Sequence, residues 1–415
     1  MNQEADRALR PEQHVVERRY QEAFESQDFF LLLEADRHIA MASARLRVLK
    51  YINPANSTEI AKQYINSSKA PQGNPRYLYR DLEFDPESTK VDLLNLPIVD
   101  SELGRIYRAK RDEVFNTICM LETRNTPEFL DRSRLLFGTT DKVTLEKADK
   151  WLTLPPEPEE TDLFDAKEAR ARLAMIVRKQ RFLCNIRVRN YLSSDAAAGE
   201  LSVALRKGAY YSLNDIESLA VHEIETHVLR TRNAEMQPFR ALFFHGFPRV
   251  DKPSSAYLST EEGLATFNEE LAGVLTNRRR RLLAGRVKAV YLMDKEEMSF
   301  YDIFNVLAND YKFSKGEAYT ICERAFRGGG YTKDHIYFTG YEQVKHLWET
   351  SPESFELLYM GKVGIAHLPI CQRLYKNGKG ILYPPRHLPV FFKDLETTVR
   401  LRMPQPSEDD DSADW

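Results

Sequence analysis

The spacing of apolar residues along the first third of the chain predicts helices. Apolar positions recur at intervals of three and four residues over 29–50, 101–121 and 143–151, which is the pattern of one buried helix face. Residues 70–75 read APQGNP between these segments, and such turn-forming residues indicate a loop. This part of the chain is therefore expected to be mainly helical.

The pattern in the rest of the chain predicts more helices and one short strand. Residues 165–187 are typical of a long basic helix, and residues 201–205, which include a β-branched valine, are typical of a strand. A further helix is expected to start at Ser212 or Asn214 and to run through His222, because apolar residues recur along it at 3.6-residue spacing. Another is expected to start near Ser259 or Thr260.

Two glycine- or proline-rich segments interrupt this pattern. The glycines at 328–330 are expected to end a helix, and residues 154–161 read LPPEPEET, a composition common in linkers. The last residues are proline-rich and then acidic, which favours disorder.

The charge balance argues against a general attraction to polyanions. The 415 residues contain 59 Lys and Arg and 62 Asp and Glu, which gives a net charge of -3. The run of four arginines at 278–281 is the one local candidate for nucleic acid, but a charged run on a helix is usually a solvated face. Nucleic acid is therefore an unlikely partner.

Cysteine usage and hydropathy indicate a cytoplasmic protein. The four cysteines are far apart and form no CxxC pair, so reduced thiols are expected rather than a disulfide framework. The first 19 residues lack the apolar region of a signal peptide, and no run of about 18 apolar residues predicts a membrane span.

Residues 222–227 read HEIETH, an HExxxH motif that is one residue longer than the HExxH of common zinc peptidases. In a regular helix a step of five residues leaves two side chains about 140° apart around the axis, whereas a step of four leaves about 40°. A single π-type turn accommodates the extra residue, and such turns often occur at functional sites. We therefore predict a local π turn between His222 and His227 that directs both imidazoles to one metal ion.

A catalytic zinc ion needs a third protein ligand and one open position. Glu262 is the candidate, because it lies in the first turn of the helix expected from Ser259 and is followed by Gly263, which permits close helix approach. Two alternatives remain open. His222 and His227 can instead be half-buried helix histidines, and Ser259 with Glu262 also fits a capping box.

Around these residues the chain resembles the microtubule-associated tyrosine carboxypeptidases and their bacterial relatives, the flavohaemoglobin expression-modulating QEGLA-motif proteins. The resemblance extends over about residues 30–400. The segments that carry it are NPRYLYRDLEF at 74–84, SRLLFGTTDKVTLEKADKWL at 133–152, HEIETHVLRTRN at 222–233, QPFRAL at 237–242, GFP at 246–248 and EEGLATFNEE at 261–270.

The resemblance implies roles for four residues. His222, His227 and Glu262 would bind one Zn²⁺ per chain, and Glu223 would be the catalytic carboxylate that activates water. The sequence departs from its relatives at Glu225, where glycine is common, and at Glu261, where the bacterial motif has glutamine. Neither is a ligand position, but both add negative charge near the site.

The resemblance also implies the reaction, which is removal of the C-terminal residue, tyrosine or another aromatic residue, from a peptide or protein. A terminal carboxylate is best recognised by arginine, and an oxyanion by a hydroxyl or imidazole donor. For these two roles together the candidates are Arg324, Arg327, Tyr331, Lys333, His335 and Tyr337. Each is otherwise a structural or solvated side chain. The strand at 201–205 is a candidate for pairing with an extended peptide.

The expected architecture is α+β and mostly α, a zincin-like metallopeptidase with a small β-sheet and a helical N-terminal portion. Tubulin is not established as the substrate by any residue, and the alternative function is a non-hydrolytic zinc-binding regulatory or partner-binding protein. The expected divisions are an N-terminal extension at 1–28, the helical portion at 29–153, a linker at 154–162, the zinc metallopeptidase catalytic portion at 163–402 and an acidic disordered tail at 403–415.

Overall fold

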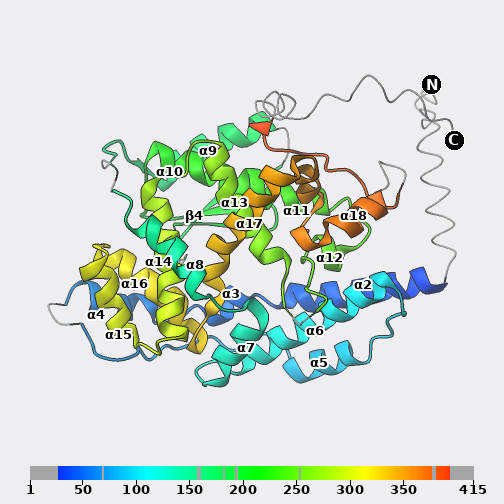
Figure 1. Cartoon of the computed structure of the whole chain (residues 1–415), viewed down its shortest axis with the longest axis horizontal. Coiled ribbons are helices and arrows are strands. Elements are labelled where there is room, and N and C mark those ends of the chain that lie inside the picture. The colour runs from blue at the N-terminus through cyan, green and yellow to red at the C-terminus, as the bar shows by residue number, and fades with distance from the viewer. Residues whose placement is uncertain are drawn as a thin grey trace.

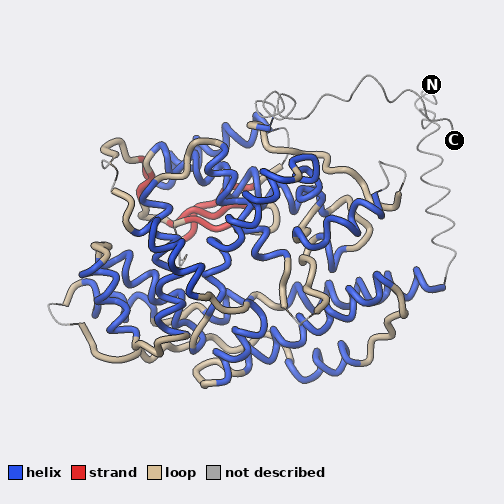
Figure 2. The backbone as a smooth tube through the Cα atoms, viewed as in Figure 1, coloured by secondary structure: helices blue, strands red, loops and turns tan. Residues whose placement is uncertain are grey.

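The chain folds mostly into helices, with short strands lying among them (Figure 2). The computed structural model describes residues 27–392 except 68–69, 156, 158–159, 181–182, 191, 193–194, 252–253 and 376–379. The predicted acidic tail at 403–415 and all but the last two residues of the predicted extension at 1–28 lie outside the described residues. The prediction of a mostly α protein with a small sheet is confirmed.

In the part of the chain that the structure describes, seven helices precede the predicted linker, and the three helical segments expected there are confirmed. The helix expected over 29–50 is interrupted after Arg45, and the one expected from residue 101 begins directly after Ser101, whose Oγ accepts the amide of Gly104 at 3.0 Å. The helices are α2 Gln27–Arg45, α3 Val48–Ile52, α4 Ser57–Ile65, α5 Pro86–Leu94, α6 Glu102–Glu122, α7 Glu128–Phe137 and α8 Lys142–Leu152.

Among the described residues, five short strands form two small sheets around α9 Ala166–Gln180. The strands are β1 Phe164–Asp165, β2 Asn185–Arg189, β3 Ala196–Ala198, β4 Ser202–Arg206 and β5 Tyr210–Tyr211. β1 pairs with β5, and β4 pairs in parallel with β2 and antiparallel with β3. The strand predicted at 201–205 is thus confirmed as β4.

Two expectations for this region were wrong. The basic helix ends at Gln180 rather than at 187, because NIRVR, with alternating buried and exposed positions, pairs in parallel with β4. The central strand β4 also has no free edge for a peptide, since β2 and β3 flank it on both sides. The edge strand β3, not β4, borders the cavity described below.

The helix predicted through His222 is confirmed and starts at a capping box. Ser212 Oγ accepts the amide of Asp215 at 3.1 Å, and the Asp215 carboxylate accepts the amide of Ser212 at 3.0 Å. The helix continues without a break as α10 Leu213–Leu219, the π-helical η1 Ala220–Val228 and α11 Leu229–Ala234.

The C-terminal half is built from helices and short 3₁₀ or π segments (Figure 1). They are α12 Arg240–Phe243, α13 Tyr257–Leu271, α14 Asn277–Asp294, α15 Phe300–Asn305, η2 Val306–Asp310, α16 Lys315–Phe326, η3 Arg327–Gly329, η4 Thr332–His335, α17 Ile336–Thr350, η5 Pro352–Met360, η6 Ile365–His367 and α18 Leu368–Tyr375. The glycines after α16 end it as predicted, and Gly328 takes φ +79°.

The close helix approach expected at Gly263 is confirmed between α13 and α17, which cross near the centre of the molecule (Figure 1). A Cβ on Gly263 would lie 2.1 Å from the carbonyl carbon of Gly340, and one on Gly340 would lie 1.9 Å from the Ser259 carbonyl oxygen. Only two glycines allow backbones to pack this closely.

One cluster of buried apolar side chains joins both sides of the predicted linker. It contains Ile39 of α2, Val203 of β4, Ile224 of η1 and Leu264 of α13. The domain boundaries remain a prediction. Within the described residues, none of the helices combines the length and apolar character that crossing a bilayer would need.

Candidate metal centre and active site

The π turn predicted between His222 and His227 is confirmed as η1, which spans Ala220–Val228. Thr226 stabilises it, since its Oγ1 donates to the carbonyl oxygen of Val221, five residues earlier, at 2.9 Å. Thr226 Oγ1 also accepts a hydrogen bond of 2.7 Å from Asn268 Nδ2 of α13. The wide turn is therefore tied to the helix that carries the third candidate ligand.

His222, His227 and Glu262 converge on one point. One potential ligand atom from each side chain lies within 4.8 Å of the others. Glu262 Oε2 is 4.0 Å from His222 Nε2 and 3.7 Å from His227 Nε2. Separations of this size suit three donors around a single tetrahedral ion.

Two carboxylates outside this triad orient the imidazoles. His222 Nδ1 lies 2.6 Å from Glu269 Oε1, and His227 Nδ1 lies 2.7 Å from Glu261 Oε1. Each carboxylate is positioned to accept the Nδ1 proton, and the neutral form of each histidine then carries its lone pair on Nε2, where it can bind a metal. In zinc sites, a carboxylate usually accepts a hydrogen bond from one ring nitrogen of a histidine while the other ring nitrogen faces the metal position.

Arginines keep both supporting carboxylates ionised. Arg230 is fully buried, and its guanidinium contacts Glu261 and donates to the carbonyl oxygens of Leu358, Gly361 and Val363. Burial alone would raise the pKa of Glu261, but Arg230 and His227 lower it to about 2. Arg279 lies 3.3 Å from Glu269 and lowers the pKa of that carboxyl in the same way.

Glu262 does not cap its helix, so the capping-box alternative was wrong. α13 starts at Tyr257, two residues before Ser259, and the Ser259 hydroxyl donates to Gln343 Oε1 at 3.2 Å. Glu262 Oε1 instead accepts a hydrogen bond of 2.8 Å from Lys333 Nζ. Although burial would raise it, Lys333 and the two histidines lower the pKa of Glu262 to about 2. Its other oxygen, Oε2, faces the histidines.

Glu223 opens into a cavity of about 400 Å³ that His222 also lines. Apolar residues such as Leu219, Leu282 and Ile321 form part of its wall. Four arginines form another part, and they are Arg278, Arg279, Arg286 and Arg324. The cavity therefore combines a carboxylate beside the candidate metal centre, an apolar surface and a concentration of positive charge.

The arginine run considered for nucleic acid is engaged within the protein. Arg278 pairs with Glu317 at 3.1 Å, Arg279 with Glu269, and Arg280 with Glu270 at 3.3 Å. Arg281 donates to the carbonyl oxygen of Tyr311 at 2.5 Å.

Three of the six residues predicted to bind substrate lie near the centre. Lys333 holds Glu262, Arg324 lines the cavity, and Tyr337 Oη lies 3.5 Å from Arg324 Nη2. Arg324 is not free, because Asp334 pairs with it through both carboxylate oxygens.

Of the six candidates, only Arg324 is among the described residues that line the cavity, and the other three have structural contacts. Arg327 is buried and donates to Asn53 Oδ1 at 2.9 Å. Tyr331 packs on Phe137 with ring centroids 5.1 Å apart. His335 Nδ1 lies 2.7 Å from the Thr332 carbonyl oxygen. A tyrosine- and histidine-rich sequence did not distinguish residues facing the site from residues packed beneath it.

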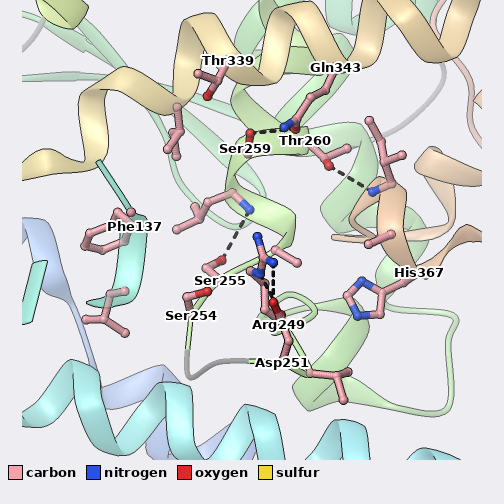
Figure 3. A pocket seen from close by; sticks show the side chains of 18 of the residues that line it. Phe137, Arg249, Asp251, Ser254, Ser255, Ser259, Thr260, Thr339, Gln343 and His367 are labelled. Atoms are coloured by element: carbon pink, nitrogen blue, oxygen red, sulfur yellow. Dashed lines mark hydrogen bonds and ion pairs between the residues drawn. The ribbon is translucent and has the colours of Figure 1, made fainter. Parts of the chain in front are cut away.

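A larger cavity of about 1030 Å³ has a different set of lining residues (Figure 3). Ser259 and Thr260 of α13, Gln343 of α17 and His367 border it. The candidate metal ligands are not among the described residues of its wall. Size alone does not identify the site here, and the smaller cavity is the one next to candidate chemistry.

Sequence reasoning missed the residues that support the centre. Glu269 had a detectable signal, because it follows Glu262 by seven residues, two helical turns, and so lies on the same face of α13. Arg230 had none, since its importance depends on which acidic group the fold places beside it.

These observations define a candidate centre of two histidines and a glutamate in a mostly helical protein. Residues 64–403 match the model of the family described as microtubule-associated tyrosine carboxypeptidase, and the chain belongs to that family. A search of curated proteins gives no match.

Two solved structures have a limited similarity to the chain. A protein from Colwellia psychrerythraea described as a lipoprotein is 13% identical with a TM-score of 0.38, and the match covers 78% of this chain and 55% of that one. A protein of unknown function from Shewanella oneidensis, also described as a lipoprotein, is 12% identical with a TM-score of 0.34 and 70% coverage of each chain. The chain thus spans about half the length of the first, and neither similarity bears on function.

Proposed function

We propose that the chain is a zinc-dependent carboxypeptidase that removes the C-terminal residue of a peptide or protein. One observation carries the proposal: His222, His227 and Glu262 converge next to a cavity into which Glu223 opens. Family membership supports the same reaction class. A helix with two histidines packed beside a small sheet also supports a zincin-like catalytic portion.

The donor set fits zinc. Two imidazole nitrogens and one carboxylate oxygen are ligands that Zn²⁺ prefers, and three protein ligands leave one position for water or substrate. When bound, such an ion lowers the pKa of a water molecule toward neutrality and polarises the scissile carbonyl. His222, His227 and Glu262 would hold it, with Glu269, Glu261 and Lys333 fixing their orientation.

Glu223 is the group in position to move protons. Its carboxylate follows the first candidate ligand in the π turn and borders the cavity, so it can accept a proton from the attacking water and deliver it to the leaving amine nitrogen. Tyr337 is the strongest of the predicted oxyanion donors, because it lies beside Arg324, Arg286 and Lys333. The cavity's apolar wall suits the side chain of one terminal residue, and aromatic residues are the first candidates.

The deciding experiment measures zinc content and cleavage of peptides with varied C-terminal residues, in the wild type and in Glu223→Gln. We expect about one zinc per chain in both proteins and release of a single C-terminal residue by the wild type. The variant should lose at least about 100-fold in rate, the usual contribution of a general base.

The other outcomes separate the alternatives. Zinc binding without peptide cleavage would favour a regulatory or partner-binding zinc protein. A protein without zinc would contradict the central proposal. A cytoplasmic location also remains a proposal, and the four cysteines are free thiols in the structure.

A further inference from the structure

The arginines of the catalytic cavity differ in one respect, which is whether a carboxylate neutralises them. Arg278 pairs with Glu317, Arg279 with Glu269 and Arg324 with Asp334. For Arg286, no hydrogen bond or ion pair is found among the described residues, and its Nε is sealed from solvent without a partner. One of the four guanidinium groups therefore has no carboxylate at ion-pair distance, and Asp334, which pairs with Arg324, acts on it only from farther away.

The neighbours of Arg286 orient its guanidinium without forming a hydrogen bond or ion pair with it. Its guanidinium carbon lies 5.1 Å from the ring centroid of Tyr337, a cation–π contact that orients the planar group. Arg324 lies 5.8 Å from the same ring. Burial, followed by repulsion from Arg324, lowers the pKa of Arg286 to about 9, and the attraction of Asp334 offsets only part of this effect.

A half-buried, oriented guanidinium without a hydrogen-bond or ion-pair partner is complementary to an anion with two coplanar oxygens. The cavity that contains it also contains His222 and Glu223. In a carboxypeptidase substrate, only one residue separates the terminal carboxylate from the scissile carbonyl, so both groups must fit into one cavity.

We propose that Arg286 binds the α-carboxylate of the substrate's C-terminal residue and thereby restricts the enzyme to free C-termini. This inference rests on the proposed function. It assigns the role to a residue different from Arg324 and Arg327, whose guanidinium groups Asp334 and Asn53 already engage. The substrate class is a peptide with an unmodified C-terminal acid, and a C-terminal amide is excluded.

The test compares one peptide as free acid and as C-terminal amide, using zinc-loaded wild type, Arg286→Gln, Arg286→Lys and Lys288→Gln. Lys288 is the matched control, because it lies on the same helix and pairs with Asp149 at 3.2 Å. We expect the ratio of kcat/KM for acid over amide to fall about 100-fold in Arg286→Gln, the effect of removing one partner of a buried charge pair. Arg286→Lys should keep part of the ratio, and Lys288→Gln should keep all of it.

A binding measurement separates this inference from the proposed function. Calorimetry with Glu223→Gln should show that N-acetyltyrosine binds at least about 10-fold more tightly than its amide, and that adding Arg286→Gln removes the difference. An unchanged preference for the acid in Arg286→Gln would overturn the inference, even if the wild type is an active carboxypeptidase. If the wild type cleaves neither peptide but the binding preference depends on Arg286, the carboxylate site stands and the proposed hydrolysis fails.

Discussion

Glu261 illustrates how one side chain connects the candidate metal centre to the protein interior. It accepts the Nδ1 proton of His227 with one oxygen and contacts the buried Arg230 with the other. The sequence suggested that a glutamate here adds negative charge to the centre. In the structure Arg230 offsets that charge, so the residue acts mainly by fixing the orientation of His227.

Replacing Glu261 should weaken zinc binding, and the loss of affinity should be larger when the substitution also removes the hydrogen-bond acceptor for His227. Glu261→Gln keeps an acceptor for His227 and should reduce zinc affinity about 10-fold, whereas Glu261→Ala removes it and should cost about 100-fold. The alanine variant should also lose about 3 kcal/mol of stability, because Arg230 stays buried without its partner. Chelator competition and urea unfolding measure the two effects.

Glu270→Gln is the control for this series. Glu270 lies on the same helix but contacts Tyr341, Lys345 and Arg280 rather than a histidine. Zinc affinity should not change in this variant. Wild-type affinity in Glu261→Ala would show that His227 does not depend on Glu261.

The π turn η1 depends on a side chain as well as on the backbone. The Thr226 hydroxyl bridges Val221 within the turn and Asn268 on α13. Asn268 is buried, and its Nδ2 also donates to Tyr359 Oη at 2.6 Å. Thr226 thus fixes the distance between the helices that carry the histidines and Glu262.

Thr226→Val should destabilise the protein and loosen the centre. The change keeps the side-chain volume but leaves a buried donor of Asn268 without one acceptor, at a cost of about 2 kcal/mol. Thr266→Val is the matched control, because the Thr266 hydroxyl makes only an ordinary bond to the Glu262 carbonyl oxygen at 2.9 Å, and it should cost less. Equal unfolding free energies and zinc affinities in the two variants would contradict a special role for Thr226.

The contact of α13 with α17 leaves no room for a side chain at Gly263 or Gly340. Gly340→Ala places a methyl group against the Ser259 backbone, so we expect a loss of about 2 kcal/mol or more and a displaced Glu262 with weaker zinc binding. Gly316→Ala in α16 meets no atom within 4 Å and should stabilise by about 0.5 kcal/mol, as alanine does in a helix. Thermal unfolding of both variants, with zinc titration, tests the contrast.

At the scale of the whole molecule, the candidate ligands come from two helices separated along the chain but packed together in one core. Binding to the folded state alone should raise stability by about 2.7 kcal/mol at a free zinc concentration 100 times Kd. Adding zinc should therefore raise Tm, and a chelator should lower it. Glu223→Gln should keep this shift and His222→Ala should abolish it, and a Tm indifferent to zinc in the wild type would contradict a metal centre in the core.

Local patterns were sufficient for the helices, for β4 and for the π turn. Apolar spacing and N-caps such as Ser101 and Ser212 act within a few residues, so they can be read without knowing the fold. The five-residue step between His222 and His227 also predicts a π turn, because a regular α-helix would point the two side chains in different directions. The end of α9 was placed wrongly because NIRVR becomes a strand only when β4 lies beside it.

The sequence by itself determined the helical class and the HExxxH motif, because these depend on residue types at short spacings, and the family resemblance implied Glu262 as the partner of that motif. The tertiary structure decided which charges meet. It placed Glu269 and Glu261 behind the histidines, directed Lys333 to Glu262 and kept Arg327 out of the cavity. Among the described residues it also left Arg286 without a hydrogen-bond or ion-pair partner, which no sequence pattern indicates, since a charge's partner depends on distances between segments far apart in the chain.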